Sequence, residues 1–461
     1  MTSLFAAAVG AQPNIVIIVA DDLGIGEMGT YGPNIPGSDP AFTPILDKLA
    51  AGGVQFNQAW SNPLCSPTRA TILTGRYGAH TGVGMPLDNV QTNADGELHA
   101  SETTLSEVLV TAPTPYAGSI IGKWHLGKFD GGDRAPLDIG GFQYHSGVVI
   151  GEITDYKNWE RFEDGISQGF EQTYATTKNV DDALDWISTQ TGPWLLYLAF
   201  NAPHEPFHVP PKNLLSKRTK KTLQQLGIQT MTDCDLNNVN RRLCYKAATE
   251  AMDQEIGRLF RLGGLTSENT VVIFLGDNGT PQDVVAPDIF PPGKNKGTVY
   301  EGGVLVPLII GGPPEIVASP NREVNHPVNI SDVFATVLEI ASATVPAGTD
   351  SISLMPYLLD PLAAQQRTYV YTEKFDGGVG VHFDPDGSAA AFNGVYKVIE
   401  GILPGGGGVG DMLACFDLVR DEFELCDLHH QPLDPVLCPH ATGIEPSECR
   451  SLYDTMELDL H

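Results

Sequence analysis

Two pairs of adjacent polar residues stand directly behind apolar runs that are typical of buried strands. Asp21 and Asp22 follow the run from Asn14 to Ala20, and Asp277 and Asn278 come one glycine after a second run. Neighbouring carboxylates at a strand end repel each other and lose hydration, so a buried pair usually needs a cation. The Asp-Asp pair alone is more typical of a solvated turn, and the second pair alone is also ordinary in turns. Together, two strand ends with four oxygen-bearing side chains predict one site for a hard divalent ion.

A cysteine opens a second segment that could carry chemistry, in which Cys65 and Arg69 flank Pro67. Pro67 suits the first turn of a helix, and the following residues continue a helical pattern, so Cys65 is expected at the helix N-terminus. The helix dipole and Arg69, one turn further on, both favour anionic character at Cys65. The segment therefore predicts an activated nucleophile beside an anion-binding site, and a buried structural cysteine is the alternative.

Further cationic or titratable side chains follow other strand-like runs. Lys123 and His125 come at alternate positions after one run, so both can project toward the same pocket. His204 follows another run, and Lys296 lies in a glycine-rich loop before the next. Each of these residues alone is more typical of a protein surface. Opposite an acidic metal site, the four together predict a pocket for an anionic substrate.

The segment Cys-x-Pro-x-Arg followed by Thr-Gly-Arg is similar to the signature of the formylglycine-dependent sulfatases of the alkaline phosphatase superfamily. Other segments resemble blocks of that family in the family's order and extend the resemblance over effectively the whole chain. These segments are Pro13 to Gly24, Thr43-Pro44, Gly122 to Gly127, Ala202 to Pro206, Gly276 to Gly279, Lys296 to Gly303 and Glu424 to Leu428. Cys426 departs from the pattern, because an aromatic residue is usual there.

The resemblance implies hydrolysis of sulfate monoesters, with an aryl or carbohydrate alcohol, by a formylglycine that a maturation enzyme makes from Cys65. In that mechanism a hydroxyl of the hydrated aldehyde attacks sulfur and expels the alcohol, and the covalent sulfate hemiester then collapses to aldehyde and sulfate. The resemblance also implies that Asp21, Asp22, Asp277, Asn278 and residue 65 bind the metal. Because the ligands are all oxygen atoms, Ca²⁺, or alternatively Mg²⁺, is favoured over Zn²⁺.

The same resemblance assigns roles to the cationic residues. Arg69, Lys123 and Lys296 would offset the charge of the sulfate, and Lys123 would help to hold the nucleophile. His125 would take the proton whose loss drives the hemiester to collapse. His204 and Lys296 would bind sulfate and assist the leaving oxygen.

Two other functions stay open on the sequence alone. Phosphonate monoester and phosphodiester hydrolases of the superfamily resemble sulfatases at these positions, and a sulfatase-like domain could serve as a catalytically silent binding protein. The loops expected to select the alcohol lie at Gly131 to Glu171 and Pro211 to Arg241. Within the first, we expect Tyr144, His145 and Ser146 to lie in a loop rather than in the pocket.

Strand-like runs alternate with amphipathic helical patterns before about residue 360. The expected strands are Ile15 to Ala20, Ser119 to Ile121, Trp194 to Phe200, Val271 to Leu275 and Val306 to Ile310, and the expected helices are Thr43 to Ala51, Asp181 to Thr189, Tyr245 to Leu262 and Ser331 to Ile340. This pattern predicts an α/β fold whose large, mostly parallel sheet is sandwiched by helices. The resemblance implies that this fold is like that of alkaline phosphatase.

After residue 360 the sequence pattern changes to short strand candidates separated by turns. They are Thr368 to Thr372, Ala389 to Phe392, Val395 to Ile399, Cys415 to Leu418 and Phe423 to Leu428. We therefore expect a leader remnant at 1–12, a catalytic domain at 13–360 and a smaller antiparallel C-terminal subdomain at 361–461.

Composition limits the partners of the chain. It has 27 Lys and Arg against 56 Asp and Glu, a net charge of −29, which argues against nucleic acid as a partner. No apolar run is long enough to span a membrane. The resemblance to the sulfatases implies as partners a small-molecule or saccharide sulfate ester and the formylglycine-generating maturation enzyme.

Cysteine usage bears on the compartment. Apart from Cys65, six cysteines fall into three couples that are local in sequence, although six cysteines allow many connectivities. The couples are Cys234 with Cys244, Cys415 with Cys426, and Cys438 with Cys449. Disulfides predict an oxidising compartment, so the protein is expected to be periplasmic or secreted, and reduced thiols in a cytosolic enzyme are the alternative.

Overall fold

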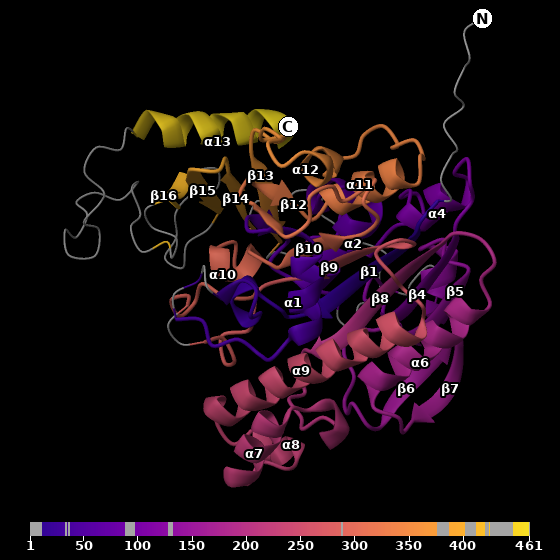
Figure 1. The fold of residues 1–461 in the computed structure, drawn as a ribbon. Helices are drawn as coiled ribbons and strands as arrows, with labels where there is room; N and C mark the ends of the chain where they lie inside the picture. The colour runs from indigo at the N-terminus through magenta and orange to yellow at the C-terminus, as the bar shows by residue number, and fades with distance from the viewer. Residues whose placement is uncertain are drawn as a thin grey trace, which may run out of the picture.

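A ten-stranded sheet forms the centre of the molecule (Figure 1). The computed structural model describes residues 12–460 except 33–34, 36, 88–96, 128–131, 287–288, 376–386, 402–411, 420–423 and 425–445. The strands of this sheet are β1 (Asn14–Asp21), β2 (Gly53–Phe56), β4 (Ala117–Lys123), β5 (Tyr144–Val148), β6 (Trp159–Glu163), β7 (Ile166–Glu171), β8 (Trp194–Pro203), β9 (Thr270–Gly276), β10 (Leu308–Gly311) and β11 (Arg322–Val324).

The strand order is β11-β2-β10-β9-β1-β8-β4-β5-β6-β7. The contiguous central strands β9, β1, β8, β4 and β5 run parallel, whereas the β2–β10, β10–β9, β5–β6 and β6–β7 pairs are antiparallel. The central strands read as continuous apolar runs because both of their faces are buried. In β1, Ile15, Ile17 and Val19 enter one core cluster, and alternate residues enter the cluster on the other face.

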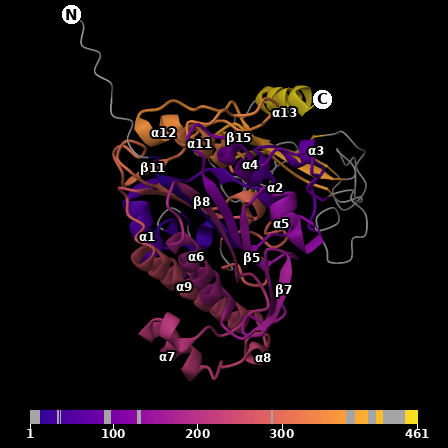
Figure 2. The same cartoon turned by 90° about the vertical axis from the view of Figure 1, so that its right-hand side faces the viewer.

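Helices cover both faces of this sheet, as Figures 1 and 2 show. The cover on one face includes α1 (Pro44–Ala51), α6 (Ala175–Ser188) and α9 (Asn238–Leu262), and that on the other includes α2 (Cys65–Thr74), α4 (Leu105–Val110) and α11 (Asp332–Ile340). This arrangement confirms the expected α/β sandwich. The remaining helices are α3 (Gly78–Thr81), α5 (Ala135–Asp138), α7 (Lys217–Gln225), α8 (Met231–Cys234), α10 (Glu301–Val304), α12 (Met355–Leu359), α13 (Pro446–Leu460), η1 (Ile25–Glu27), η3 (Gly132–Arg134) and η4 (Lys212–Leu214).

A small antiparallel sheet follows in the C-terminal part, as expected. Its strands, in spatial order, are β13 (Val370–Lys374), β14 (Ser388–Phe392), β15 (Tyr396–Gly401) and β16 (Met412–Asp417), and a two-stranded pair is made by β3 (Ala59–Trp60) and β12 (Val328–Asn329). Helix α13, which the sequence did not indicate, packs on β14 and β15 (Figure 1). Within the expected strand at Phe423 to Leu428 only Glu424 is described, and it lies outside any strand. We propose that residues 361–461 form this subdomain.

The disulfides confirm one expected couple and correct another. Cys234 bonds to Cys244, as expected. Cys415 bonds to Cys449 rather than to its sequence neighbour Cys426, because α13 returns across the sheet and brings Cys449 against β16. Cys426 and Cys438 lie outside the described residues.

One further expectation about local structure was wrong, and another is confirmed with a shifted start. Tyr144, His145 and Ser146 begin strand β5, where they pair with β4, so they do not lie in a loop. The strand expected at Val306 begins at Leu308 and runs antiparallel to β9. In the described part of the chain, no helix combines the length and apolar character that crossing a bilayer requires.

Gly122 is the point of closest approach between β4 and its neighbours. Its φ is +102°, and a Cβ at this position would lie 1.9 Å from the carbonyl oxygen of Ala199. A side chain there would meet rigid backbone in a conformation that only glycine adopts readily. The residue therefore allows β4 to deliver Lys123 to the edge of the sheet.

We expect Gly122→Ala to reduce the free energy of unfolding by about 2–4 kcal/mol. The added methyl group would both strain the backbone at its positive φ and press against neighbouring backbone atoms. Urea unfolding measures the loss. Gly192→Ala is the matched control, since no atom lies within 4 Å of its Cβ position, and it should change stability by less than about 0.5 kcal/mol. Equal effects of the two variants would contradict this account.

Candidate active site

Four parallel strands deliver site residues to one edge of the sheet. β1 ends at Asp21 and β4 ends at Lys123, and the chain reaches His204 and Asp277 directly after β8 and β9 end. Because parallel strands end on the same side of a sheet, residues that are far apart in sequence meet there. The residues expected to share one site are therefore brought together.

Asp21 and Asp277 are buried and face cations. Lys123 Nζ donates to Asp21 Oδ2 at 2.5 Å, and Arg69 Nη2 lies 3.8 Å from the same oxygen. Arg69 Nη2 donates to Asp277 Oδ2 at 2.8 Å, and Arg69 Nη1 donates to the carbonyl of Lys123 at 3.0 Å. Arg69 thus cross-links the ends of β1, β4 and β9.

Asp22 occupies a left-handed backbone conformation, with φ at 71°. Its backbone N–H donates to Asp277 Oδ1 at 3.0 Å. Its carboxylate oxygen Oδ1 accepts from Asn278 Nδ2 at 2.7 Å and pairs with Lys296 Nζ at 2.5 Å. Neighbouring polar groups therefore hold both the backbone and the side chain of Asp22.

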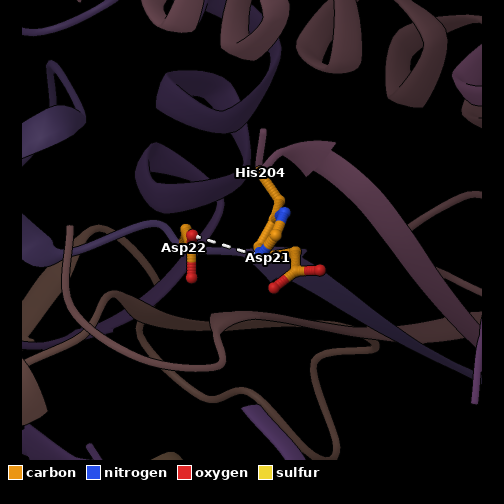
Figure 3. Close-up of side chains that lie close together, drawn as sticks. All are labelled: Asp21, Asp22 and His204. Carbon is orange, nitrogen blue, oxygen red and sulfur yellow. Dashed lines mark ion pairs between the residues drawn. The ribbon is translucent and has the colours of Figure 1, made fainter. Parts of the chain in front are cut away.

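Two buried oxygen atoms in this cluster have no hydrogen-bond partner, Asp21 Oδ1 and Asn278 Oδ1. An unsatisfied buried acceptor is unfavourable unless a donor or a cation completes it. Ligand atoms of Asp21, Asp22 and His204 lie within 4.8 Å of one another. Figure 3 shows these three side chains close together. The donor set fits a divalent cation that prefers oxygen ligands.

The carboxyl groups differ in their pKa. Burial raises the pKa of Asp21, but Lys123, followed by His204 and Arg69, lowers it below its usual range. Burial and the charge of Asp21 raise the pKa of Asp277 to about 6. The cluster thus keeps Asp21 ionised and makes Asp277 the carboxyl group that protonates more readily.

Cys65 is the first residue of α2 and is only 4% exposed. The structure confirms its place at the helix N-terminus but corrects the expectation of an activated thiol. Burial raises the pKa of the thiol, and the nearby charges of Lys123 and Lys296 do not fully offset this. As an unmodified cysteine, residue 65 is therefore a poor nucleophile.

His125 is held as a neutral imidazole. Its φ is 58°, and its Nε2 lies 3.1 Å from the carbonyl oxygen of Leu87. Since a carbonyl only accepts, Nε2 carries the proton, and the buried Nδ1, which has no partner, is the free acceptor. Burial, with Lys123 and Arg69, lowers the pKa of His125 well below its usual value. His125 is therefore uncharged and presents a free lone pair at Nδ1.

His204 presents the opposite ring nitrogen. Its Nδ1 lies 2.8 Å from the carbonyl oxygen of Glu205, so Nδ1 carries the proton, and Nε2 lies 3.7 Å from Asp22 Oδ2 (Figure 3). Nε2 therefore faces the carboxylate of Asp22. Burial lowers the pKa of Lys296, but Asp22 and Cys65 more than offset this and raise it above its usual value, so Lys296 stays charged.

A sulfatase family model matches residues 13–343 of this chain. The chain belongs to the sulfatase family. N-acetylgalactosamine-6-sulfatase of Rattus norvegicus is 32% identical over 403 residues, covering 80% of this chain and 70% of that protein. Steryl-sulfatase of Mus musculus is 29% identical over 511 residues, covering 92% of this chain and 78% of that protein.

Solved structures share the fold of this sulfatase. Ps i-CgsB in complex with k-i-k-neocarrahexaose has a TM-score of 0.72 at 21% identity, covering 97% of this chain and 93% of that one. A protein in complex with its substrate D-glucosamine-2-N,6-O-disulfate has a TM-score of 0.70 at 19% identity, covering 97% of each chain. The named sulfatase relatives make this chain a sulfuric ester hydrolase.

A buried ion cluster, missed in the sequence analysis, fixes the loop that carries Lys296. Lys397 of β15 pairs with Glu301 Oε1 at 2.9 Å and with Glu424 Oε1 at 2.8 Å, and its Nζ lies 4.4 Å from the ring centroid of Trp60. Trp60 Nε1 donates to Glu301 Oε2 at 3.3 Å. The C-terminal sheet is thereby joined to the segments before Cys65 and after Lys296. A lysine within an otherwise apolar strand is the signal that could have revealed it.

Two other contacts at the site could not be predicted from the sequence. Tyr245 OH donates to the carbonyl of Asp22 at 2.7 Å, and the backbone N–H of Leu87 donates to Ser66 Oγ at 3.1 Å. Both contacts join segments that are far apart in the chain. No local pattern could have indicated either of them.

In this sulfatase we expect Lys397→Met to reduce the free energy of unfolding by about 3–5 kcal/mol, because two carboxylates would stay buried without their cation. The triple variant that also carries Glu301→Gln and Glu424→Gln should recover part of the loss. Chemical denaturation of these variants measures both effects. An equal loss in the single and the combined variants would show that the charges do not carry the interaction.

Proposed function

We propose that this sulfatase hydrolyses sulfate monoesters through a formylglycine made from Cys65. The observation that carries the proposal is the position of residue 65 at the start of α2, beside Lys123 and Lys296 and at the carboxylate cluster of Asp21 and Asp277. A thiol with a raised pKa is ill suited to attack there. The oxidised residue would supply an oxygen nucleophile. Attack by that oxygen would give the covalent sulfate hemiester that the family resemblance implies.

The metal would be held by Asp21, Asp22, Asp277 and Asn278, with the modified residue 65 completing the ligand set. Ca²⁺ is favoured, with Mg²⁺ as the alternative, because these ligands are oxygen atoms. A divalent ion at this place would lower the pKa of an oxygen ligand and offset negative charge on the ester. Asp21 Oδ1 and Asn278 Oδ1, which lack partners, support this assignment.

The chain's own residues would divide the remaining tasks. Lys123 and Arg69 hold the carboxylates of Asp21 and Asp277 in place, and Lys123 also lies near residue 65. His125 would accept, at Nδ1, the proton whose loss releases sulfate. Lys296 would bind the sulfate oxygens, and His204 would assist the leaving oxygen.

The alcohol of the substrate is proposed to be a saccharide or an aryl group. Relatives of this chain named for N-acetylgalactosamine-6-sulfate hydrolysis, and fold neighbours solved with sulfated saccharides, support the saccharide. The Cys234–Cys244 and Cys415–Cys449 disulfides support a periplasmic or secreted location.

Activity and peptide mass together test the nucleophile. Protein made in its native source, or with a maturation enzyme, should carry the aldehyde at position 65 and hydrolyse 4-nitrophenyl sulfate in preference to phenylphosphonate esters. Cys65→Ala should lower kcat/KM by about 10³-fold or more, because the reacting atom is lost. An unmodified thiol in active protein would contradict the proposal that residue 65 is a formylglycine. A preference for phosphorus esters would indicate a phosphonate or phosphodiester hydrolase instead of a sulfatase activity. An aldehyde-bearing protein without turnover would favour a binding protein.

Metal removal tests the ion site separately from turnover. Dialysis against EDTA should lower Tm, and Ca²⁺ should restore it, because binding to the folded state alone stabilises that state. Asn278→Ala should weaken Ca²⁺ about 10-fold or more in calorimetric titration. The control is Asn213→Ala, on the exposed surface. A Tm that is indifferent to Ca²⁺ in wild type would count against a metal at these carboxylates.

A further inference from the structure

The most cationic segment of the chain lies in and around helix α7. Residues 206–232 contain no Asp or Glu, although the chain as a whole has a net charge of −29. The same segment holds five of the 27 Lys and Arg residues: Lys212, Lys217, Arg218, Lys220 and Lys221. The concentration of positive charge on one short helix contrasts with the rest of the molecule.

These cations do not stabilise helix α7. Lys217 and Arg218 are the first two residues of α7, where the helix dipole disfavours cations. Lys217, Lys220 and Lys221 share one helix face, so their like charges repel. Within the described parts of the chain, no carboxylate lies within ion-pair distance of any of these side chains. Departures from local preference of this kind are typical of binding surfaces.

A cavity of about 590 Å³ lies beside the inner face of α7. Arg218, Thr219 and Thr222 line it from α7, Lys246 lines it from α9, and Phe42, which is 57% exposed, lies at its rim. Asp39 also lines the cavity, where it pairs with Lys246 at 2.7 Å and is close enough to Arg218 for that charge to help lower its pKa. The two cations exceed this one carboxylate, so the cavity keeps a net positive charge. A cation, hydroxyl groups and an exposed ring together suit an anionic sugar. We call α7 and this cavity the cationic groove.

The cationic groove adjoins the active site across one helix. Tyr245 of α9 donates to the carbonyl of Asp22, and the next residue along α9, Lys246, lines the cavity. Consecutive helix residues point about 100° apart, so the two sites lie on adjacent sides of the same turn of α9, separated by up to about one helix diameter, or ~10–12 Å. A saccharide chain of a few units can cover this distance, whereas a single sugar cannot.

We propose that the cationic groove binds a sulfated polysaccharide chain while one of its sulfate esters occupies the active site. The inference rests on the proposed sulfate-ester hydrolysis and adds that the substrate is a polymer. Helix α7 is nine residues long, so it spans about 13 Å and contacts only a short stretch of polyanion. A stiff nucleic-acid duplex would extend over the acidic remainder of the surface, whereas a flexible sugar chain can turn away from it.

Binding of fluorescent dextran sulfate tests the groove directly. Lys217→Gln combined with Lys221→Gln should weaken binding about 5-fold or more at low salt, and the slope of log affinity against log salt should fall by about 1.4, as for two lost contacts to a flexible polyanion. The matched control is Lys48→Gln with Arg261→Gln, which removes two exposed charges from the opposite end of α9 and should bind as wild type. Neutral dextran should not bind.

Three results would overturn the inference: no binding of dextran sulfate by wild type, an equal loss in the control variant, or equal binding of single-stranded DNA of the same charge. Turnover separates this inference from the proposed function. The α7 variant should raise KM for a sulfated polysaccharide substrate about 5-fold and leave kcat/KM for 4-nitrophenyl sulfate unchanged. Absence of all turnover in aldehyde-bearing wild type, with groove-dependent binding intact, would reject the hydrolytic function and not the groove.

Discussion

Charge balance among buried groups at the end of the parallel sheet is the constraint on which the site depends. Three carboxylates face three cations there: Asp21, Asp22 and Asp277 against Arg69, Lys123 and Lys296. Near neutral pH these charges cancel, since the raised pKa of Asp277 still leaves it largely ionised. A divalent ion would then leave an excess of positive charge, which an anionic ester could match. A strongly acidic protein can in this way attract an anion into one small volume.

The same cluster holds backbone in unfavourable conformations. Asp22 and His125 both have positive φ, which a side chain rarely adopts. The backbone N–H of Asp22 is held by Asp277, and its carbonyl is held by the hydroxyl of Tyr245. Local strain is thus balanced by hydrogen bonds from distant segments, as is common where reacting groups must be aimed. The geometry of the site is therefore a property of the whole fold rather than of the strand ends alone.

The sequence indicated the central strands and the residues at their ends, because parallel strands buried on both faces read as continuous apolar runs. It missed β7, whose side chains are largely exposed, and the short strands β2 and β11, which carry too few residues for a pattern. It paired Cys415 wrongly, since only the return of α13 brings Cys449 close. It overestimated the reactivity of the Cys65 thiol, because a helix N-terminus is visible in a sequence whereas the depth of burial is not.

The depth of Cys65 also bears on how the enzyme is made. A side chain that is 4% exposed in the finished molecule is out of reach of a second enzyme, so the proposed conversion of Cys65 would have to precede closure of the fold. Lys397 and Glu424, which lock the loop of Lys296, are synthesised long after Cys65. The order of the chain thus leaves an interval during translation in which the cysteine has emerged and its surroundings are not yet assembled. Biogenesis, like catalysis, is constrained by where these few residues fall along the polypeptide.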